Sequence, residues 1–234
     1  MLLALWSPKG GSGTSVLAAA CAAALARQGS CRLADLAGDQ PAILGLGADP
    51  ETGLADWLAT GADAPVEALD RLAIEVAPGL ELVPPGAPRL LAPAAAAEAG
   101  AALGAALHAT GRPCVVDAGR ADLPASRMVV EVADCSVVVV RGCYLTLRRA
   151  VHAPLTARAT GIAFVDEPGR SLGVAEARDV LELPVLVRVP VRPAIARAVD
   201  AGVLAVRPPE PLARAAARLV DRLERMHASS RGLA

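Results

Sequence analysis

Short apolar runs recur along the whole chain, separated by polar and glycine-containing segments. Most of these runs are continuous instead of alternating, which is typical of parallel strands that are covered on both faces. The pattern predicts strands at Leu2–Trp6, Arg32–Asp35, Leu80–Val83, Pro113–Asp117, Ser136–Arg141, Ile162–Val165 and Val185–Val189.

The longer stretches between these runs have helical spacing of apolar positions. They predict helices at about 14–28, 53–60, 89–110, 122–132, 145–159, 173–182, 193–201 and 210–227. Because strands alternate with helices throughout, we expect right-handed crossovers and an α/β fold with a doubly wound, mostly parallel sheet between helices. No break in composition divides the chain, so we expect one domain over residues 1–228 and a disordered tail over 229–234.

The composition favours a globular protein of the reduced cytoplasm. Hydrophobic residues make up 54% of the 234 residues, but alanine is the main contributor and no apolar run approaches the ~20 residues of a membrane span. The five cysteines are scattered, and no C-x-x-C motif or Cys/His cluster occurs. This spacing supports neither a disulfide framework nor a zinc site.

Charge is distributed unevenly along the chain. Residues 1–140 carry 8 basic and 15 acidic side chains, whereas residues 141–234 carry 15 arginines and 9 acidic side chains. The C-terminal part therefore has a net charge of +6, which indicates a possible contact with DNA or an acidic partner. Solvated helix faces with i,i+4 ion pairs explain the same arginines equally well.

A glycine-rich loop follows the first predicted strand and precedes the first predicted helix. It reads Ser7-Pro8-Lys9-Gly10-Gly11-Ser12-Gly13-Thr14-Ser15 and contains the only lysine of the chain. A strand, such a loop and a helix together form a phosphate cradle, because backbone N–H groups and the helix N-terminus converge on an anion. An ordinary P-loop has its lysine directly after the last glycine. Here that position is Thr14.

The loop resembles the deviant Walker A motif of the MinD/ParA family of P-loop ATPases, K-G-G-x-G-K-[ST]-[ST]. Lys9, Gly10, Gly11 and Gly13 match this motif, and Ser15 falls on its magnesium-binding hydroxyl position. The resemblance implies a P-loop NTPase fold that binds ATP or ADP with Mg²⁺. It also implies a homodimer formed through the P-loop face, in which Lys9 would reach the partner's nucleotide. The loop residues expected at the nucleotide are Lys9, Gly10, Gly11, Ser12, Gly13, Thr14 and Ser15.

Two aspartates end predicted strands, where ligands bind in such sheets. Asp117 closes Cys114-Val115-Val116-Asp117 in the Walker B form, and Asp35 corresponds to the first aspartate of the D-x-D switch segment in the resembled family. We expect Ser15, Asp35 and Asp117 to be the metal residues, with a helix cap as the alternative role of Asp117. The stretch from Gly38-Asp39-Gln40 to Leu44-Gly45-Leu46 resembles the TadZ/CpaE pilus-assembly branch.

Two departures from the family pattern bear on hydrolysis. Thr14 cannot supply a cation to the phosphates, and Ala37 stands where the second switch aspartate would position the attacking water. Positioning and electrostatic stabilisation are nearly all that a protein contributes to phosphoryl transfer. We therefore expect weak nucleotide binding with impaired or absent hydrolysis. Asp39 is the alternative water-positioning group, and a purely structural loop is the alternative reading of the whole motif.

The C-terminal part adds two features. Val189-Pro190-Val191-Arg192-Pro193 resembles the family's turn beside the adenine base, so Pro190 and Arg192 are further candidate nucleotide contacts. The last predicted helix is amphipathic, and its apolar face lacks Phe and Trp, which favours packing against the sheet over binding to a membrane.

Taken together, the residues favour a hydrolysis-impaired positioning or scaffold protein that acts as a dimer, with pilus assembly as a candidate process. A slow partition-type ATPase whose dimer binds nonspecific DNA is the first alternative. An interaction module that binds no nucleotide is the second. The protein partner is not identified by the sequence.

Overall fold

A computed structural model describes residues 1–231, with side chains described to Ser229. Its centre is one eight-stranded sheet with the order β3-β4-β2-β5-β1-β6-β7-β8. All neighbouring strands are parallel except the edge pair β3 and β4. The strands are β1 Leu2–Trp6, β2 Cys31–Asp35, β3 Ile74–Ala77, β4 Leu80–Val83, β5 Cys114–Asp117, β6 Cys135–Arg141, β7 Gly161–Asp166 and β8 Val185–Pro190.

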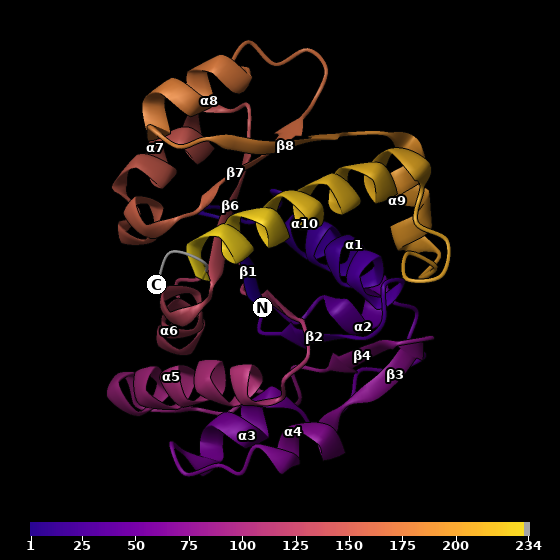
Figure 1. Cartoon of the computed structure of the whole chain (residues 1–234), viewed down its shortest axis with the longest axis vertical. Coiled ribbons are helices and arrows are strands. Elements are labelled where there is room, and N and C mark those ends of the chain that lie inside the picture. The colour runs from indigo at the N-terminus through magenta and orange to yellow at the C-terminus, as the bar shows by residue number, and fades with distance from the viewer. Residues whose placement is uncertain (232–234) are drawn as a thin grey trace.

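Helices cover both faces of this sheet (Figure 1). One layer contains α1 (Thr14–Ala26), α2 (Gln40–Ile43), α9 (Pro193–Asp200) and α10 (Glu210–Arg231). The other contains α3 (Leu54–Thr60), α4 (Glu67–Leu72), α5 (Pro93–Ala109), α6 (Pro124–Val132), α7 (Tyr144–His152), the 3₁₀ helix η1 (Pro154–Arg158) and α8 (Val174–Leu181). The predicted α/β fold with a doubly wound, mostly parallel sheet is confirmed.

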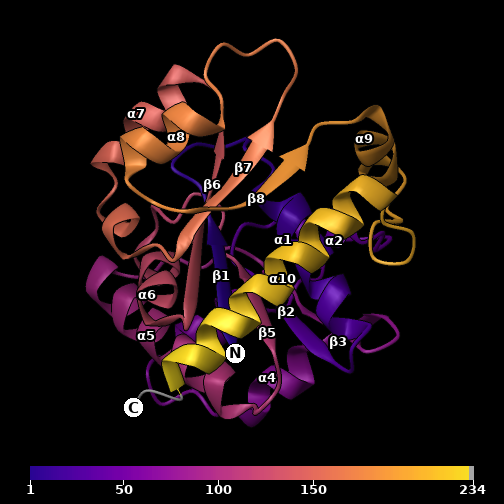
Figure 2. The same cartoon turned by 45° about the horizontal axis from the view of Figure 1, so that its top comes forward.

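Helix α1 packs against β1, β2 and β5 and against α10, which belongs to the same layer and also contacts β8 (Figure 2). Nearly all side chains of α1 are buried, and most of them are alanine. A helix that is apolar all round must be covered on every side, and alanine lets two helices approach closely. The apolar face of α10, including Leu212, Leu219 and Leu223, is fully buried in the same layer. The expected packing of the last helix within the domain is therefore confirmed.

Three differences from the predicted elements have local causes. Strand β3, helix α2 and helix α4 have only 4, 4 and 6 residues, too short for a periodic pattern to show. The helix expected at 145–159 ends at His152 because Pro154 follows, and the residue before a proline avoids helical backbone angles. Helix α10 extends to Arg231, while residues 232–234 of the expected tail lie outside the described part.

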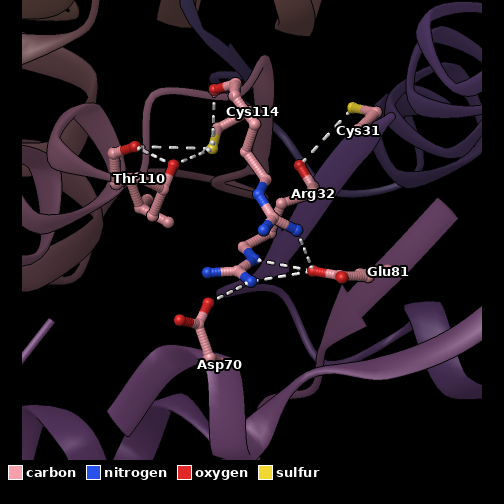
Figure 3. Close-up of polar contacts among 8 residues, drawn as sticks. Cys31, Arg32, Asp70, Glu81, Thr110 and Cys114 are labelled. Carbon is pink, nitrogen blue, oxygen red and sulfur yellow. Dashed lines mark hydrogen bonds and ion pairs between the residues drawn. The ribbon is translucent and has the colours of Figure 1, made fainter. Parts of the chain in front are cut away.

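Arg32, near the N-terminal end of β2, is held by acidic side chains from β4 and α4 (Figure 3). Arg32 on β2 is 1% exposed and forms ion pairs with Glu81 on β4 at 2.7 Å and with Asp70 on α4 at 2.6 Å. Arg112 forms a second ion pair with Glu81 at 2.7 Å. These contacts hold α4 and the β3–β4 edge against β2.

Candidate nucleotide site

The glycine-rich loop connects β1 to α1 and is closed by its own serines. Ser7 Oγ and Ser12 Oγ both donate to the carbonyl oxygen of Lys9, at 2.9 and 2.8 Å. Gly11 and Gly13 have φ values of +75° and +88°, which side chains other than glycine adopt only with strain. The sequence of the loop therefore determines a tight turn that delivers the chain directly into α1.

The N-terminus of α1 is open to an anion. Gly13 is its N-cap, no side chain accepts a hydrogen bond from its first turn, and that turn contains no acidic residue. The first N–H groups of a helix lack partners within the helix, and the helix dipole makes this end positive. The loop and the start of α1 can therefore bind phosphate through the backbone.

A cavity of about 790 Å³ lies over this helix end. Its walls come from the loop, the switch segment after β2, the segment after β5 and the end of α9. Lining residues include Gly10, Gly11, Ser12, Gly13, Thr14, Ser15, Ala37, Asp39, Gly119, Arg120, Asp122 and Asp200.

Neither Thr14 nor Lys9 provides a positive charge inside this cavity. Thr14 lines it but is 5% exposed, and its Oγ1 has no hydrogen-bond partner among the described residues. Lys9 Nζ donates to the carbonyl of Gly10 at 3.1 Å, and Lys9 is not one of the lining residues. The single lysine thus lies outside the cavity that its own loop forms.

Asp35 and Asp117 lie side by side at the ends of β2 and β5, which are neighbouring strands of the sheet. Both are fully buried, and neither lines the cavity over α1. Asp35 lines a neighbouring cavity of about 770 Å³, which shares Leu36 and Ala37 with the first. Asp35 accepts hydrogen bonds from the backbone N–H groups of Ala37, Gly38 and Gln40 at 2.7–2.9 Å. The carboxylate therefore organises the switch segment.

Burial and the nearby Asp117 raise the pKa of Asp35 to about 7, against the opposing effect of its three N–H donors. Burial also raises the pKa of Asp117, and a hydrogen bond from Gln40 offsets part of that rise. Because the two carboxyl groups are buried next to each other, ionisation of one makes ionisation of the other less favourable.

Gln40 connects the switch segment to the phosphate loop. Its side-chain amide donates to Asp117 Oδ2 at 2.8 Å and to the carbonyl of Ser15 at 2.9 Å. Gln40 is fully buried, so these bonds are shielded from water. Sequence reasoning missed this residue because a glutamine carries no chemical signature of its own.

Ser15 and Asp39 are the pair that faces the cavity. Ser15 Oγ donates to Asp39 Oδ2 at 3.4 Å, and both residues line the cavity, as does Ala37. A serine hydroxyl and a carboxylate suit Mg²⁺, which usually keeps several waters and takes the remaining ligands from one or two carboxylates and from phosphates. Within residues 1–231, no group of three or more His, Cys, Asp or Glu side chains forms a metal cage.

A third cavity of about 310 Å³ adjoins the first across the loop. It is lined by Pro190 and Arg192, and it shares Gly11, Ser12, Gly13, Val16, Val199 and Asp200 with the larger cavity. Arg141 supports the shared wall, because its guanidinium donates to the carbonyl of Gly11 at 2.8 Å and pairs with Glu167 at 2.7 Å. The loop residues and the Pro190–Arg192 turn are therefore neighbours in space.

Comparison with solved structures identifies the fold. A ParA family ATPase from Chlorobium tepidum superimposes with a TM-score of 0.73 at 24% identity, over 95% of this chain and 97% of that chain. The chain has the fold of the MinD/ParA ATPases. A chain of the MinC:MinD cell division complex from Aquifex aeolicus gives a TM-score of 0.75 at 19% identity, over 95% of both chains. MinD from Pyrococcus horikoshii, solved with Mg-ADP, gives 0.72 at 22% identity over 96% of both chains.

No protein-family model and no curated protein matches the sequence. The MinD/ParA fold nevertheless extends over nearly the whole chain in these superpositions. Within this fold, the structure brings together the loop, Ser15, Asp39 and the Pro190–Arg192 turn around the two cavities. It places Asp35 and Asp117 behind them, connected through Gln40.

None of the helices in the described part of the chain combines the length and apolar character that a membrane crossing requires. All five cysteines are free.

Proposed function

We propose that this chain is a positioning or scaffold protein of the MinD/ParA kind that binds ATP or ADP with Mg²⁺ weakly and hydrolyses ATP slowly or not at all. The observation that carries the proposal is the uncapped N-terminus of α1, which opens into a cavity of about 790 Å³ beside a second one of about 310 Å³. A phosphate cradle next to a smaller, mostly apolar recess suits a nucleotide.

In this proposal the phosphates lie against the N–H groups of Gly10 to Ser15, and the base lies against Pro190 and Arg192. Ser15 and Asp39 hold the Mg²⁺, with Asp117 and Asp35 orienting the segment that carries Asp39. Bound Mg²⁺ would neutralise phosphate charge that Thr14 leaves uncompensated. MinD from Pyrococcus horikoshii, which has the same fold, was solved with Mg-ADP.

Impaired hydrolysis follows from two side chains that line the cavity. Thr14 carries no charge, and Ala37 carries no group that could orient water. Asp39 faces the same cavity, but its carboxylate accepts a hydrogen bond from Ser15 at 3.4 Å, which favours a metal role over a water-positioning role.

We further propose that the protein acts in the cytoplasm as a homodimer joined through the P-loop face. Support comes from Lys9, which lies outside the cavity of its own chain and is available to a second copy. An unidentified protein partner would bind the dimer. Pilus assembly is the candidate process, because the stretch that begins at Gly38 resembles TadZ. The MinC:MinD complex shows that a protein with this fold can bind a partner.

The test is a titration with Mg-ATP that follows both the melting temperature and the molecular mass. The expected result is a rise in melting temperature and a shift from monomer to dimer in the wild type. Gly13→Ala, which strains the loop at φ +88°, should abolish both responses. Gly29→Ala, where the added methyl group would meet nothing within 4 Å, is the matched control. No response of the wild type to millimolar Mg-ATP would overturn nucleotide binding and favour an interaction module.

The second candidate is a slow partition-type ATPase whose dimer binds nonspecific DNA. The observation that favours it is the net charge of +6 over residues 141–234. Several of these arginines are already engaged: Arg214 pairs with Glu210, and Arg222 donates to backbone carbonyls of β8. If DNA binds, its affinity should fall steeply as salt is raised from 50 to 200 mM.

A further inference from the structure

The larger cavity contains one positive side chain that the sequence motifs do not indicate. Of the described residues that line it, Arg120 alone is an arginine or lysine, whereas Asp39, Asp122 and Asp200 are acidic. A phosphate bound at the α1 N-terminus would therefore have Arg120 as its nearest source of cationic charge within the cavity.

The segment after β5 holds Arg120 over the phosphate loop. The carbonyl of Gly119 accepts a hydrogen bond from the N–H of Ser7 at 2.8 Å, which ties this segment to the start of the loop. A methyl group at Gly10 would lie 3.7 Å from Cδ of Arg120, an ordinary van der Waals distance, so the arginine stem passes directly over Gly10. Ala121 has a φ of +49°, a strained value for alanine, and such residues cluster at ligand sites.

The Arg120 guanidinium forms an exposed ion pair with Asp122, which a bound anion could replace. It pairs with Asp122 Oδ2 at 2.5 Å, and the two side chains are 58% and 54% exposed. An ion pair this exposed contributes little to stability, so an incoming anion can compete for the guanidinium. The planar arginine group also offers parallel N–H donors that match phosphate oxygens, which a lysine cannot provide.

We propose that Arg120 is the phosphate-binding cation of this site and supplies the charge that Thr14 lacks at the usual lysine position. The inference rests on the proposed nucleotide binding. On binding, the guanidinium exchanges Asp122 for phosphate oxygens while its stem stays on Gly10. Because the charge reaches the phosphates from the β5 side and not from α1, the site uses a different residue from the ordinary P-loop for the same electrostatic task.

The test measures binding of Mg-ATP, and separately of inorganic tripolyphosphate, to Arg120→Gln by calorimetry. Loss of charge-assisted hydrogen bonds should weaken both ligands by about tenfold to a hundredfold. The matched control is Arg178→Gln, since Arg178 pairs with Asp179 at 2.9 Å with exposures of 61% and 64%, outside both cavities. The control should change affinity by less than about twofold.

Two more variants test whether the positive charge of Arg120 is what determines the affinity. Asp122→Asn frees Arg120 and removes a negative charge from the cavity, so it should tighten binding by about twofold to fivefold. Thr14→Lys combined with Arg120→Gln should restore affinity, because the lysine returns the missing charge. Wild-type affinity in Arg120→Gln, with no change in Asp122→Asn, would overturn the role of Arg120 and leave nucleotide binding intact. A wild type that binds neither ligand would overturn the proposed function together with this role.

Discussion

Gln40, the first residue of α2, donates a hydrogen bond to Asp117 at the end of β5, at 2.8 Å between Nε2 and Oδ2. The same amide nitrogen donates to the carbonyl of Ser15, so one buried side chain joins the switch segment, the end of β5 and the first turn of α1. Three parts of the site that are distant in sequence are therefore mechanically coupled.

Gln40→Ala should lower stability by about 2–4 kcal/mol, because it removes a fully buried side chain and leaves Oδ2 of the buried Asp117 without its donor. Urea unfolding monitored by circular dichroism measures this loss. Gln28→Ala is the control, since Gln28 is exposed just after α1 and should change stability by less than about 0.5 kcal/mol. Similar losses in the two variants would contradict the structural role given to Gln40.

Asp35 should make the fold more stable in mild acid than at neutral pH. Its pKa is raised to about 7 in the folded chain against 3.8 for an ordinary aspartate, so the folded state holds a proton that the unfolded state has released. Stability should therefore decrease as pH rises through the window from about 4 to about 7. Melting temperatures of wild type and Asp35→Asn across this range check the sign. The decline should be smaller in Asp35→Asn, and an equal decline would argue against it.

Gly45→Ala should destabilise the contact between α2 and α9. Gly45 has a φ of +79°, and a Cβ atom there would lie 2.3 Å from the carbonyl oxygen of Gly202. The backbone strain alone costs about 1–2 kcal/mol, and the steric overlap adds to it. Nucleotide affinity should fall as well, because Val199 and Asp200 of α9 line both cavities.

Gly47→Ala provides the comparison for this variant, since an added Cβ there meets nothing within 4 Å. Its melting temperature should match that of the wild type within a degree or two. A large drop in Gly47→Ala would show that the whole segment, and not the Gly45–Gly202 approach, is sensitive.

Glu81→Ala should cost roughly 3 kcal/mol, because it removes the main partner of the buried Arg32. Asp70→Ala should cost about 1 kcal/mol or less, since Asp70 is 60% exposed and water can replace it. Chemical denaturation of both variants tests this order. A larger loss for Asp70→Ala than for Glu81→Ala would mean that the Arg32–Asp70 ion pair contributes more to stability than the Arg32–Glu81 ion pair.

Restoring both missing catalytic groups should raise ATP turnover. Thr14→Lys together with Ala37→Asp returns a cation to the phosphates and a carboxylate to the cavity wall, and a gain of at least about tenfold is expected. Phosphate release under saturating Mg-ATP is the measurement. A double variant that binds ATP but hydrolyses no faster than the wild type would remove the explanation given for impaired hydrolysis.

Seven of the eight described strands were predicted, because most of them are largely apolar runs bounded by polar or turn residues. β1 and β4 agree with the prediction at both ends, and Asp35 and Asp117 are the last residues of their strands, as predicted. The edge strand β3 was not predicted, since Ile74-Glu75-Val76-Ala77 is short and only partly buried, so the core imposes little pattern on it.

The sequence predicted those parts of the candidate site that belong to recognisable motifs. Gly10 to Ser15 and the Pro190–Arg192 turn line neighbouring cavities, whereas the predicted contact Lys9 lines neither of them. The sequence did not predict Gln40 and Arg120 as site residues, because their roles come from tertiary contacts and not from residue type or local spacing. The burial of Asp35 and Asp117 behind the cavity also required coordinates, since sequence order shows which strand end carries a carboxylate but not which side of it faces a ligand.

The position of β1 between β5 and β6, with one cavity lined by residues from Ser7 to Asp200, has a consequence for synthesis of the protein. The phosphate loop leaves the ribosome among the first segments, yet its binding pocket is complete only after α9 has emerged and docked. Contacts this distant in sequence form late. If the chain binds nucleotide as proposed, capture would therefore begin only on a nearly finished polypeptide, and the nascent chain would not engage nucleotide early.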